Sequence, residues 1–98
     1  MTSKKPPKVD VFIYKIKPKM TLIALLDGPL QSAKLAKKVN MTPQGLSRLL
    51  MVAEILDLIS YETVRGRRIN TLTDYGRGIA ENLARGQEKA ARKLEPQR

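Results

Sequence analysis

The spacing of hydrophobic residues along this chain predicts helices in its first half, a β-hairpin after Asp57 and a final helix. In three stretches the apolar residues recur every three to four positions, which is the period of an amphipathic helix. They predict a helix that begins near Pro18, a short helix over Ala33–Val39 and a third helix from Pro43 to about Leu56. These three helices are the expected core of the domain.

The ends of these helices carry capping residues. Asp27-Gly28-Pro29 closes the first helix, because glycine tolerates a positive φ and proline cannot continue a helix. Ser32 is expected to cap the second helix, and Asn40 is expected to end it with a positive φ. Thr42-Pro43 is the strongest start signal in the chain, since threonine caps a helix and proline fits its first position.

Two β-prone runs, Ile59–Val64 and Arg68–Thr73, flank the segment Arg65-Gly66-Arg67 and predict a hairpin with glycine at its bend. The alternation of polar and apolar residues in these runs is imperfect, so it leaves the register open. Thr73-Asp74 predicts the start of the final helix, as a cap followed by an acidic residue that suits the helix dipole.

The two ends of the chain have weaker patterns. The final helix places Tyr75, Ile79 and Leu83 on one face, which indicates core or dimer interface, and Gly86 either ends this helix or lets it continue to Pro96. At the other end, Val9–Ile16 is β-prone and is expected to be a short strand or an extended segment. The sequence thus divides into a disordered basic arm (1–8), one domain (9–85) and a helical extension or tail (86–98).

The composition removes most catalytic and metal-binding chemistry. The chain has no Cys and no His, which excludes disulfides, thiolate or imidazole zinc sites and catalysis by either residue. The nine acidic residues are scattered and no Gly-rich phosphate loop is present. We therefore expect no enzyme, no catalytic residue, no metal and no cofactor. The longest apolar runs have five residues, so no membrane-spanning helix and no membrane partner are expected.

The chain carries a large excess of positive charge. Nineteen Lys and Arg residues against nine Asp and Glu residues give a net charge of +10 in 98 residues. The excess is spread along the whole sequence and is not confined to the lysines of the first eight residues. A small chain with this imbalance is expected to bind a polyanion, usually nucleic acid.

The order of the predicted elements is that of a winged helix-turn-helix: two helices joined by the turn Asn40-Met41-Thr42, followed by a hairpin. In this arrangement the second helix, here residues 43–56, enters the major groove with its N-terminal residues at the base edges. Opposite its apolar stripe stand Gln44, Ser47 and Arg48, which are side chains that can hydrogen-bond bases. The free amides at the helix N-terminus suit a phosphate.

Residues 29–83 resemble the winged-helix core of small prokaryotic transcription regulators of the broad MarR/PadR-like kind. The resemblance rests on SAKLAKKVNMTPQGLSRLL (32–50), ILDLISYETVRGRRINTLT (55–73) and LTDYGRGIAENL (72–83). It implies an α+β, mostly α fold with a three-helix core, a β-hairpin wing and a C-terminal helix.

The resemblance also implies the DNA-binding residues. Lys34, Lys37 and Lys38 would approach the DNA backbone from the helix before the recognition helix. In the wing (64–69), the tip arginines would reach phosphates or the minor groove. The full expected set is Lys34, Lys37, Lys38, Thr42, Gln44, Ser47, Arg48, Arg65, Arg67 and Arg68. Gly76 and Gly78 would be packing positions without contact to DNA.

Three features depart from the family pattern. Asp57 stands where these proteins commonly have Gly after the recognition helix, so a strained or different turn is expected. Gly45 lies in the first turn of that helix, which suggests the close approach of another group. Met51, Val52 and Ile55 are apolar where charged residues are usual on the outer face, and such a cluster is a candidate surface for a protein partner.

Three functions remain open at this point. The first is a sequence-preferring double-stranded DNA-binding regulator, acting as a homodimer in the cytoplasm at the nucleoid. Its dimer surface would be the last helix, the segment 9–16 or the Met51 cluster. The second is an abundant, weakly specific protein that coats nucleic acid in the manner of a chromatin protein. The third is a winged-helix interaction subunit of a larger complex.

Overall fold

A computed structural model describes residues 9–94, with side-chain surroundings for residues 12–86. The predicted basic arm (1–8) and the last four residues of the chain lie outside this range. The elements in chain order are α1 (Val9–Tyr14), α2 (Ile16–Ala24), the 3₁₀ helix η1 (Leu25–Asp27), β1 (Leu30–Gln31), α3 (Ser32–Val39), α4 (Pro43–Ile55), β2 (Ile59–Val64), β3 (Arg67–Leu72) and α5 (Asp74–Leu94).

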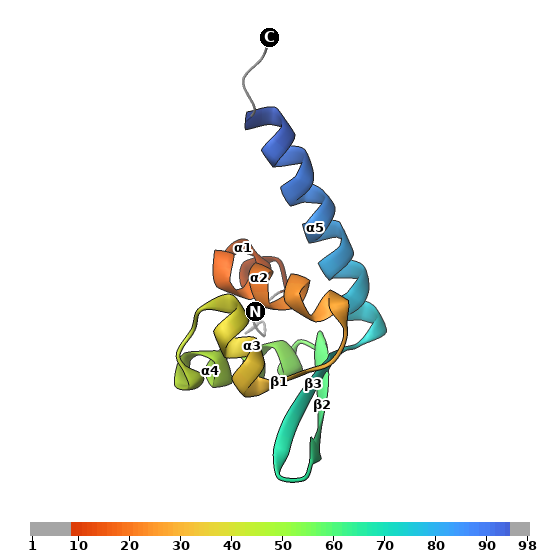
Figure 1. The fold of residues 1–98 in the computed structure, drawn as a ribbon. Helices are drawn as coiled ribbons and strands as arrows, with labels where there is room; N and C mark the ends of the chain where they lie inside the picture. The colour runs from red at the N-terminus through yellow and green to blue at the C-terminus, as the bar shows by residue number, and fades with distance from the viewer. Residues whose placement is uncertain (1–8, 95–98) are drawn as a thin grey trace, which may run out of the picture.

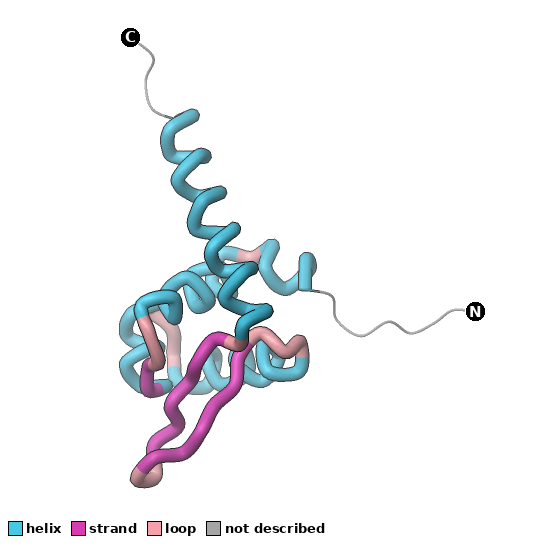
Figure 2. The backbone as a smooth tube through the Cα atoms, turned by 90° about the vertical axis from the view of Figure 1, so that its right-hand side faces the viewer, coloured by secondary structure: helices cyan, strands magenta, loops and turns pink. Residues whose placement is uncertain are grey.

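The predicted fold class is confirmed: the described chain is mostly helical, with a three-helix core, a hairpin and a C-terminal helix. Helices α2, α3 and α4 form the body of the domain (Figure 1). The β2–β3 hairpin projects from one end of this body, and α5 leaves it in the opposite direction in both views (Figures 1 and 2). The turn of the hairpin and the far end of α5 therefore lie at opposite ends of the described chain.

The hydrophobic core lies where α2, α3 and α4 meet. Its largest fully buried apolar side chains are Leu22, Leu25, Leu35, Val39, Leu46, Leu50, Leu58 and Ile59. Helix α5 packs on α2 and β3 and contributes Ala80, which is fully buried. The apolar stripe predicted for residues 43–56 is confirmed, since its members Leu46, Leu50 and Ala53 are all buried.

The hairpin belongs to a three-stranded antiparallel sheet of order β1-β3-β2. Strand β1 pairs with β3 through Leu30↔Asn70 and Gln31↔Ile69. The sequence did not predict β1, because a strand of two residues is too short to show an alternating pattern. Its pairing anchors the base of the hairpin to the residues that lead into α3.

The hairpin turn is shorter than predicted. Val64 pairs with Arg67, so Arg67 belongs to β3 and the loop consists of Arg65 and Gly66 alone. Both loop residues have positive φ, 53° and 77°. A two-residue loop with this backbone matches the right-handed twist of the strands, which favours it over a longer turn.

The prediction for Val9–Ile16 was wrong. Residues Val9–Tyr14 form helix α1, and Ile16 already starts helix α2. β-propensity describes how well a side chain fits a half-buried pleated surface, so it decides nothing where no strand edge is offered. Phe12 and Ile13 instead pack against the helical core. Pro18 is the third residue of α2, a position where its missing N–H is not needed.

The predicted ends of α3 and α4 are largely confirmed. Asn40 ends α3 in the left-handed conformation, at φ 57°. The Gly45 N–H donates a hydrogen bond to Thr42 Oγ1 at 3.0 Å, so Thr42 caps α4. Ser32, in contrast, does not cap α3: Gln31 holds the cap position, and no side chain bonds there. Asp57 has a positive φ of 63°, which is the strained turn expected where this residue replaces glycine.

Helix α5 begins as predicted, and two side chains of its predicted apolar face, Ile79 and Leu83, pack against the core. The Gly76 N–H donates to Thr73 Oγ1 at 2.9 Å, and the helix runs without a break through Gly86 to Leu94. The predicted boundary at residue 86 falls inside it, and the division of the chain there remains a prediction. Tyr75 is not in the core, since it is 51% exposed. Gly76 is the packing position, whereas Gly78 faces open space, against the expectation for it.

Candidate nucleic-acid interface

The N-terminal half of α4 presents polar side chains to solvent. Gln44, Ser47 and Arg48 are exposed, as the helical spacing predicted. The cap at Thr42 fixes where the helix begins and therefore where these three side chains project. Gly45 lies beside that cap: a Cβ at this position would lie 3.1 Å from Thr42 Oγ1. The close approach expected at Gly45 is thus to the helix's own cap.

The hairpin carries two of its three arginines freely in solvent. Arg65 lies in the turn and Arg67 at the first position of β3, and both are exposed. Between Ser60 and Arg67 every residue of the hairpin is exposed. The outer part of the hairpin is therefore a solvated projection with positive charge at its end.

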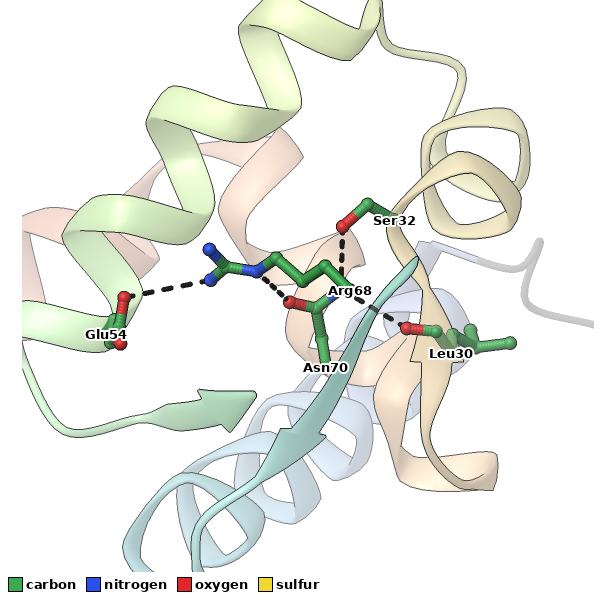
Figure 3. Close-up of polar contacts among 5 residues, drawn as sticks. All are labelled: Leu30, Ser32, Glu54, Arg68 and Asn70. Carbon is green, nitrogen blue, oxygen red and sulfur yellow. Dashed lines mark hydrogen bonds and ion pairs between the residues drawn. The ribbon is translucent and has the colours of Figure 1, made fainter. Parts of the chain in front are cut away.

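Arg68 differs from the other two arginines, because its side chain turns back toward the body of the domain (Figure 3). Its Nε donates to Asn70 Oδ1 at 2.8 Å, and its Nη2 lies 3.7 Å from Glu54 Oε1 of α4. Its guanidinium carbon lies 3.8 Å from the centroid of the Tyr61 ring, which is cation–π geometry. The sequence grouped Arg68 with the tip, whereas the structure places it at the side of the hairpin that faces α4.

Asn70 connects this arginine to the start of α3. Asn70 is fully buried, and its Nδ2 donates to Leu30 O at 3.2 Å and to Ser32 Oγ at 3.0 Å (Figure 3). Ser32, expected to cap α3, thus accepts a hydrogen bond from the sheet. Asn70 is not among the residues predicted from the sequence. The available signal was its position two residues before Leu72, which places a polar side chain on the inward face of β3.

The lysines of α3 lie at the surface. Lys34, Lys37 and Lys38 are all exposed, as predicted. Lys38 Nζ lies 3.3 Å from Asp27 Oδ2, and both side chains are mostly solvated. Such a surface ion pair contributes little to stability, so it leaves the lysine available to other anions.

A lysine that the sequence analysis did not single out holds the end of α3. Lys17 Nζ donates to the carbonyl oxygens of Val39 at 2.8 Å and Asn40 at 3.3 Å. A cation at a helix C-terminus satisfies unpaired carbonyls and complements the dipole. Lys17 therefore connects α2 to the turn that precedes α4.

A hollow lies between the start of α3, the first half of α4 and β3. Its volume is about 240 Å³, and it is lined by Ser32, Ala33, Pro43, Leu46, Ser47, Leu50 and Arg68. Ser47 and Arg68 face the same space, so the N-terminal half of α4 and the base of the hairpin are neighbours. The exposed side chains of α4 and the basic hairpin therefore belong to one surface of the molecule.

The second half of α4 has a different character. Met51 is 57% exposed and Ile55 is 67% exposed, and Val52 beside them is partly buried. Met51 and Ile55 continue, at helical spacing, the stripe that begins with Gln44 and Arg48. The outer face of α4 thus changes from polar to apolar along its length.

The structure offers no set of side chains for a metal ion within residues 9–94: no three His, Cys, Asp or Glu residues come together there. In the same range, no helix is long and apolar enough to cross a membrane.

Known proteins resemble this chain in structure more than in sequence. No protein-family model and no curated protein matches the sequence. The transcriptional regulator homologue protein from Pyrococcus horikoshii OT3 matches with a TM-score of 0.76 and 20% identity, over 90% of this chain and 92% of that one. Reduced HlyU from Vibrio cholerae N16961 matches with a TM-score of 0.72 and 19% identity, over 79% of this chain and 82% of that one.

A third structure carries the name of the family that the sequence resembles. The MarR family transcriptional regulator SPO1453 from Silicibacter pomeroyi DSS-3 matches with a TM-score of 0.73 and 23% identity. The match covers 82% of this chain but 59% of that regulator, so the chain spans less than two thirds of its length. At these identities the likeness establishes architecture, and the chain has the winged helix-turn-helix fold that its sequence resembles.

Proposed function

We propose that this protein is a double-stranded DNA-binding transcription regulator with a sequence preference. The observation that carries the proposal is the shared surface of α4 and the hairpin. Exposed Gln44, Ser47 and Arg48 stand at the capped start of α4, beside a hairpin that ends in exposed arginines. The net charge of +10 supports it, as do the transcriptional regulator and the transcriptional regulator homologue of the same fold.

In this proposal the first half of α4 enters the major groove. An arginine can pair with O6 and N7 of guanine, a glutamine with N6 and N7 of adenine, and a serine with a base or a phosphate. Arg48 and Gln44 would therefore carry most of the sequence preference. Pro43 has no N–H, and the Gly45 and Leu46 N–H groups donate to Thr42, so the Gln44 N–H is the amide left at the helix start for a DNA phosphate.

The remaining basic residues would bind the DNA backbone. Arg65 and Arg67 extend from the hairpin toward phosphates or the adjacent minor groove, and Lys34, Lys37 and Lys38 approach from α3. Contacts to phosphates position a protein on DNA without reading its sequence. The proposal therefore assigns affinity to the hairpin and α3, and specificity to α4.

We expect the functional form to be a homodimer, because one winged helix covers a small footprint and a two-fold pair doubles its contacts. Of the three surfaces that the sequence left open, the structure favours the α1–α2 region with α5. Ile16 is 68% exposed beside exposed Tyr14, and α5 projects away from the hairpin (Figure 2). A dimer formed there leaves both DNA-facing surfaces free.

Ile16→Glu should convert the dimer into a monomer, because a charge at the centre of an apolar contact must be desolvated. Light scattering coupled to gel filtration would then give 11.0 kDa where the unaltered protein gives twice this mass. Ile55→Glu is a matched control, since Ile55 is 67% exposed but lies on α4. Dissociation by Ile55→Glu alone would instead place the dimer surface on α4.

Arg48→Ala should relax the sequence preference, with a loss of about 1–3 kcal/mol on duplexes that the unaltered protein selects from a random pool. Its affinity for unselected duplexes should change little. Arg67→Ala removes the same charge and should weaken binding to all duplexes by a similar factor. Competition binding with selected and random duplexes measures both variants. Equal losses on both duplexes for Arg48→Ala would contradict base readout by this residue.

Two other functions make different predictions in the same experiment. A DNA-coating protein would select no sequence from the pool, so that selected and random duplexes would bind equally. An interaction subunit would bind no duplex at moderate salt and would use the apolar half of α4 on a protein. The exposure of Met51 and Ile55 is the observation that favours this second candidate.

A further inference from the structure

One side chain, Arg68, joins the hairpin to the helices on which DNA binding is proposed. It contacts Asn70 on its own strand, Tyr61 on β2 and Glu54 on α4. Through the buried Asn70 it reaches Leu30 of β1 and Ser32 at the start of α3. A single residue thereby links both strands of the hairpin to the two helices of the helix-turn-helix.

Beyond its base, which pairs with β1, the hairpin has little other support for its direction. From Ser60 to Arg67 all its residues are exposed, so nothing in the described chain covers its outer part. On the face that turns toward α4, burial extends from Ile59 and Leu72 to Asn70, and Arg68 is the next residue outward. Arg68 therefore stands where the packed base of the hairpin meets its free part.

We propose that Arg68 is a positioning residue that sets the angle between the hairpin and α4, and so determines whether both reach one DNA duplex together. The inference rests on the function proposed above. It takes Arg68 out of the expected set of direct phosphate contacts. Arg65 and Arg67 would touch the DNA, whereas Arg68 would act through the direction it gives to them.

The chemistry of the guanidinium explains why an arginine stands at this point. Its planar group stacks on the Tyr61 ring while one edge donates to Asn70 and another lies near the Glu54 carboxylate. Arginine can make these contacts at once, because its face is free to cover a ring while its N–H groups diverge in the plane of a rigid fork. A lysine would keep the positive charge but has a single ammonium group on a flexible stem.

Arg68→Lys separates positioning from charge, since it leaves the net charge at +10. We expect the affinity for the selected duplexes to fall about tenfold, because the hairpin would no longer be held where its contacts fit the DNA. Hydroxyl-radical footprints should lose the protection that the hairpin gives while they keep the protection under α4. Arg85→Lys is the matched control at an exposed position on α5, outside the proposed interface, and its affinity and footprint should stay near those of the unaltered protein.

The angle itself can be measured without DNA. The chain has no cysteine, so spin labels can be placed on Met51→Cys of α4 and Val64→Cys near the hairpin turn, both at exposed positions. The distribution of distances between the labels should broaden when Arg68→Lys is added and stay narrow when Arg67→Lys is added. An unchanged melting temperature in the Arg68→Lys protein would show that the domain has kept its fold.

The possible results separate this inference from the proposed function. If Arg68→Lys broadens the distance distribution and removes the hairpin footprint, both the role of Arg68 and the proposed function are supported. An unchanged distribution overturns the role of Arg68, even where DNA binds as expected. A broadened distribution in a protein that binds no duplex supports the control of the angle but contradicts the proposed function. If Glu54→Gln leaves the distance distribution narrow while Arg68→Lys broadens it, Tyr61 and Asn70 hold Arg68 in place and Glu54 does not.

Discussion

Affinity for a DNA duplex should fall by about a thousandfold between about 50 and 200 mM monovalent salt, if each dimer neutralises roughly six phosphates. The reason is the release of counterions, which becomes less favourable as the bulk salt concentration rises. On each protomer the exposed residues that can make these contacts are Lys34, Lys37, Lys38, Arg65 and Arg67. Fluorescence anisotropy of a labelled duplex at several salt concentrations gives the slope of log K against log salt.

The slope should respond to charges at the proposed surface and not to the net charge alone. Arg65→Ala and Arg67→Ala should each reduce the slope by about 0.9 for each phosphate contact that is lost. Arg85→Ala is a control of equal charge, since Arg85 is exposed on α5, which leaves the domain on the side away from the hairpin (Figure 1). A flat salt response, or an equal effect of Arg85→Ala, would show that DNA does not bind as proposed.

Gly76→Ala should destabilise the domain more than any surface change considered above. A Cβ at Gly76 would lie 1.9 Å from the carbonyl oxygen of Leu58 and 2.7 Å from its carbonyl carbon. These are backbone atoms, and the same oxygen accepts the Thr73 N–H at 3.1 Å. Either α5 or the segment between α4 and β2 must move, at a cost of about 3 kcal/mol. For a domain of this size the melting temperature should fall by about 12–24 °C.

Gly78→Ala is the matched control on the same helix. A Cβ at Gly78 meets nothing within 4 Å, and the residue is exposed. Alanine is a better helix former than glycine, so this variant should gain about 0.5–1 kcal/mol. Thermal unfolding followed by circular dichroism compares the two proteins directly. Equal melting temperatures would mean that the contact between α5 and Leu58 is not tight.

The features that the sequence predicted correctly depend on neighbouring residues. Thr42 and Thr73 bond to amides three residues later, and Asn40 and Gly66 supply positive φ where a helix or hairpin must turn. These signals need no knowledge of the rest of the fold. The exposure of Gln44, Ser47 and Arg48 follows in the same way from helical spacing once the buried stripe of α4 is known.

The features that it predicted wrongly depend on what lies across from each residue. Val9–Ile16 has the composition of a strand, but it forms helices that pack on the core. In the stripe expected to be core or dimer interface on α5, Ile79 and Leu83 pack on the core whereas Tyr75 is exposed, and Gly76 beside it makes the close contact. A pattern of side chains along the chain does not show how closely two backbones approach.

In the candidate site, too, the sequence predicts which residues are basic but not what lies across from each of them. Arg65, Arg67 and Arg68 form one basic cluster in the sequence, but the structure leaves two of them in solvent and turns the third toward α4. The period of two along β3 places Arg68 on the face of Asn70, although it does not say that Glu54 and Tyr61 lie within reach. That distinction separates a charge available to DNA from one that holds the hairpin.

From α2 onward and apart from β1, the sequence by itself determined the order of the main elements, most of their ends and the polar face of α4, because capping, turn geometry and helical period are local properties of the chain. Only the tertiary structure decided the two-residue strand β1, the contact of Gly76 with Leu58 and the links from Arg68 to α4 and, through Asn70, to α3. Each of these joins segments that are distant in sequence, and the packing of the whole core brings them together.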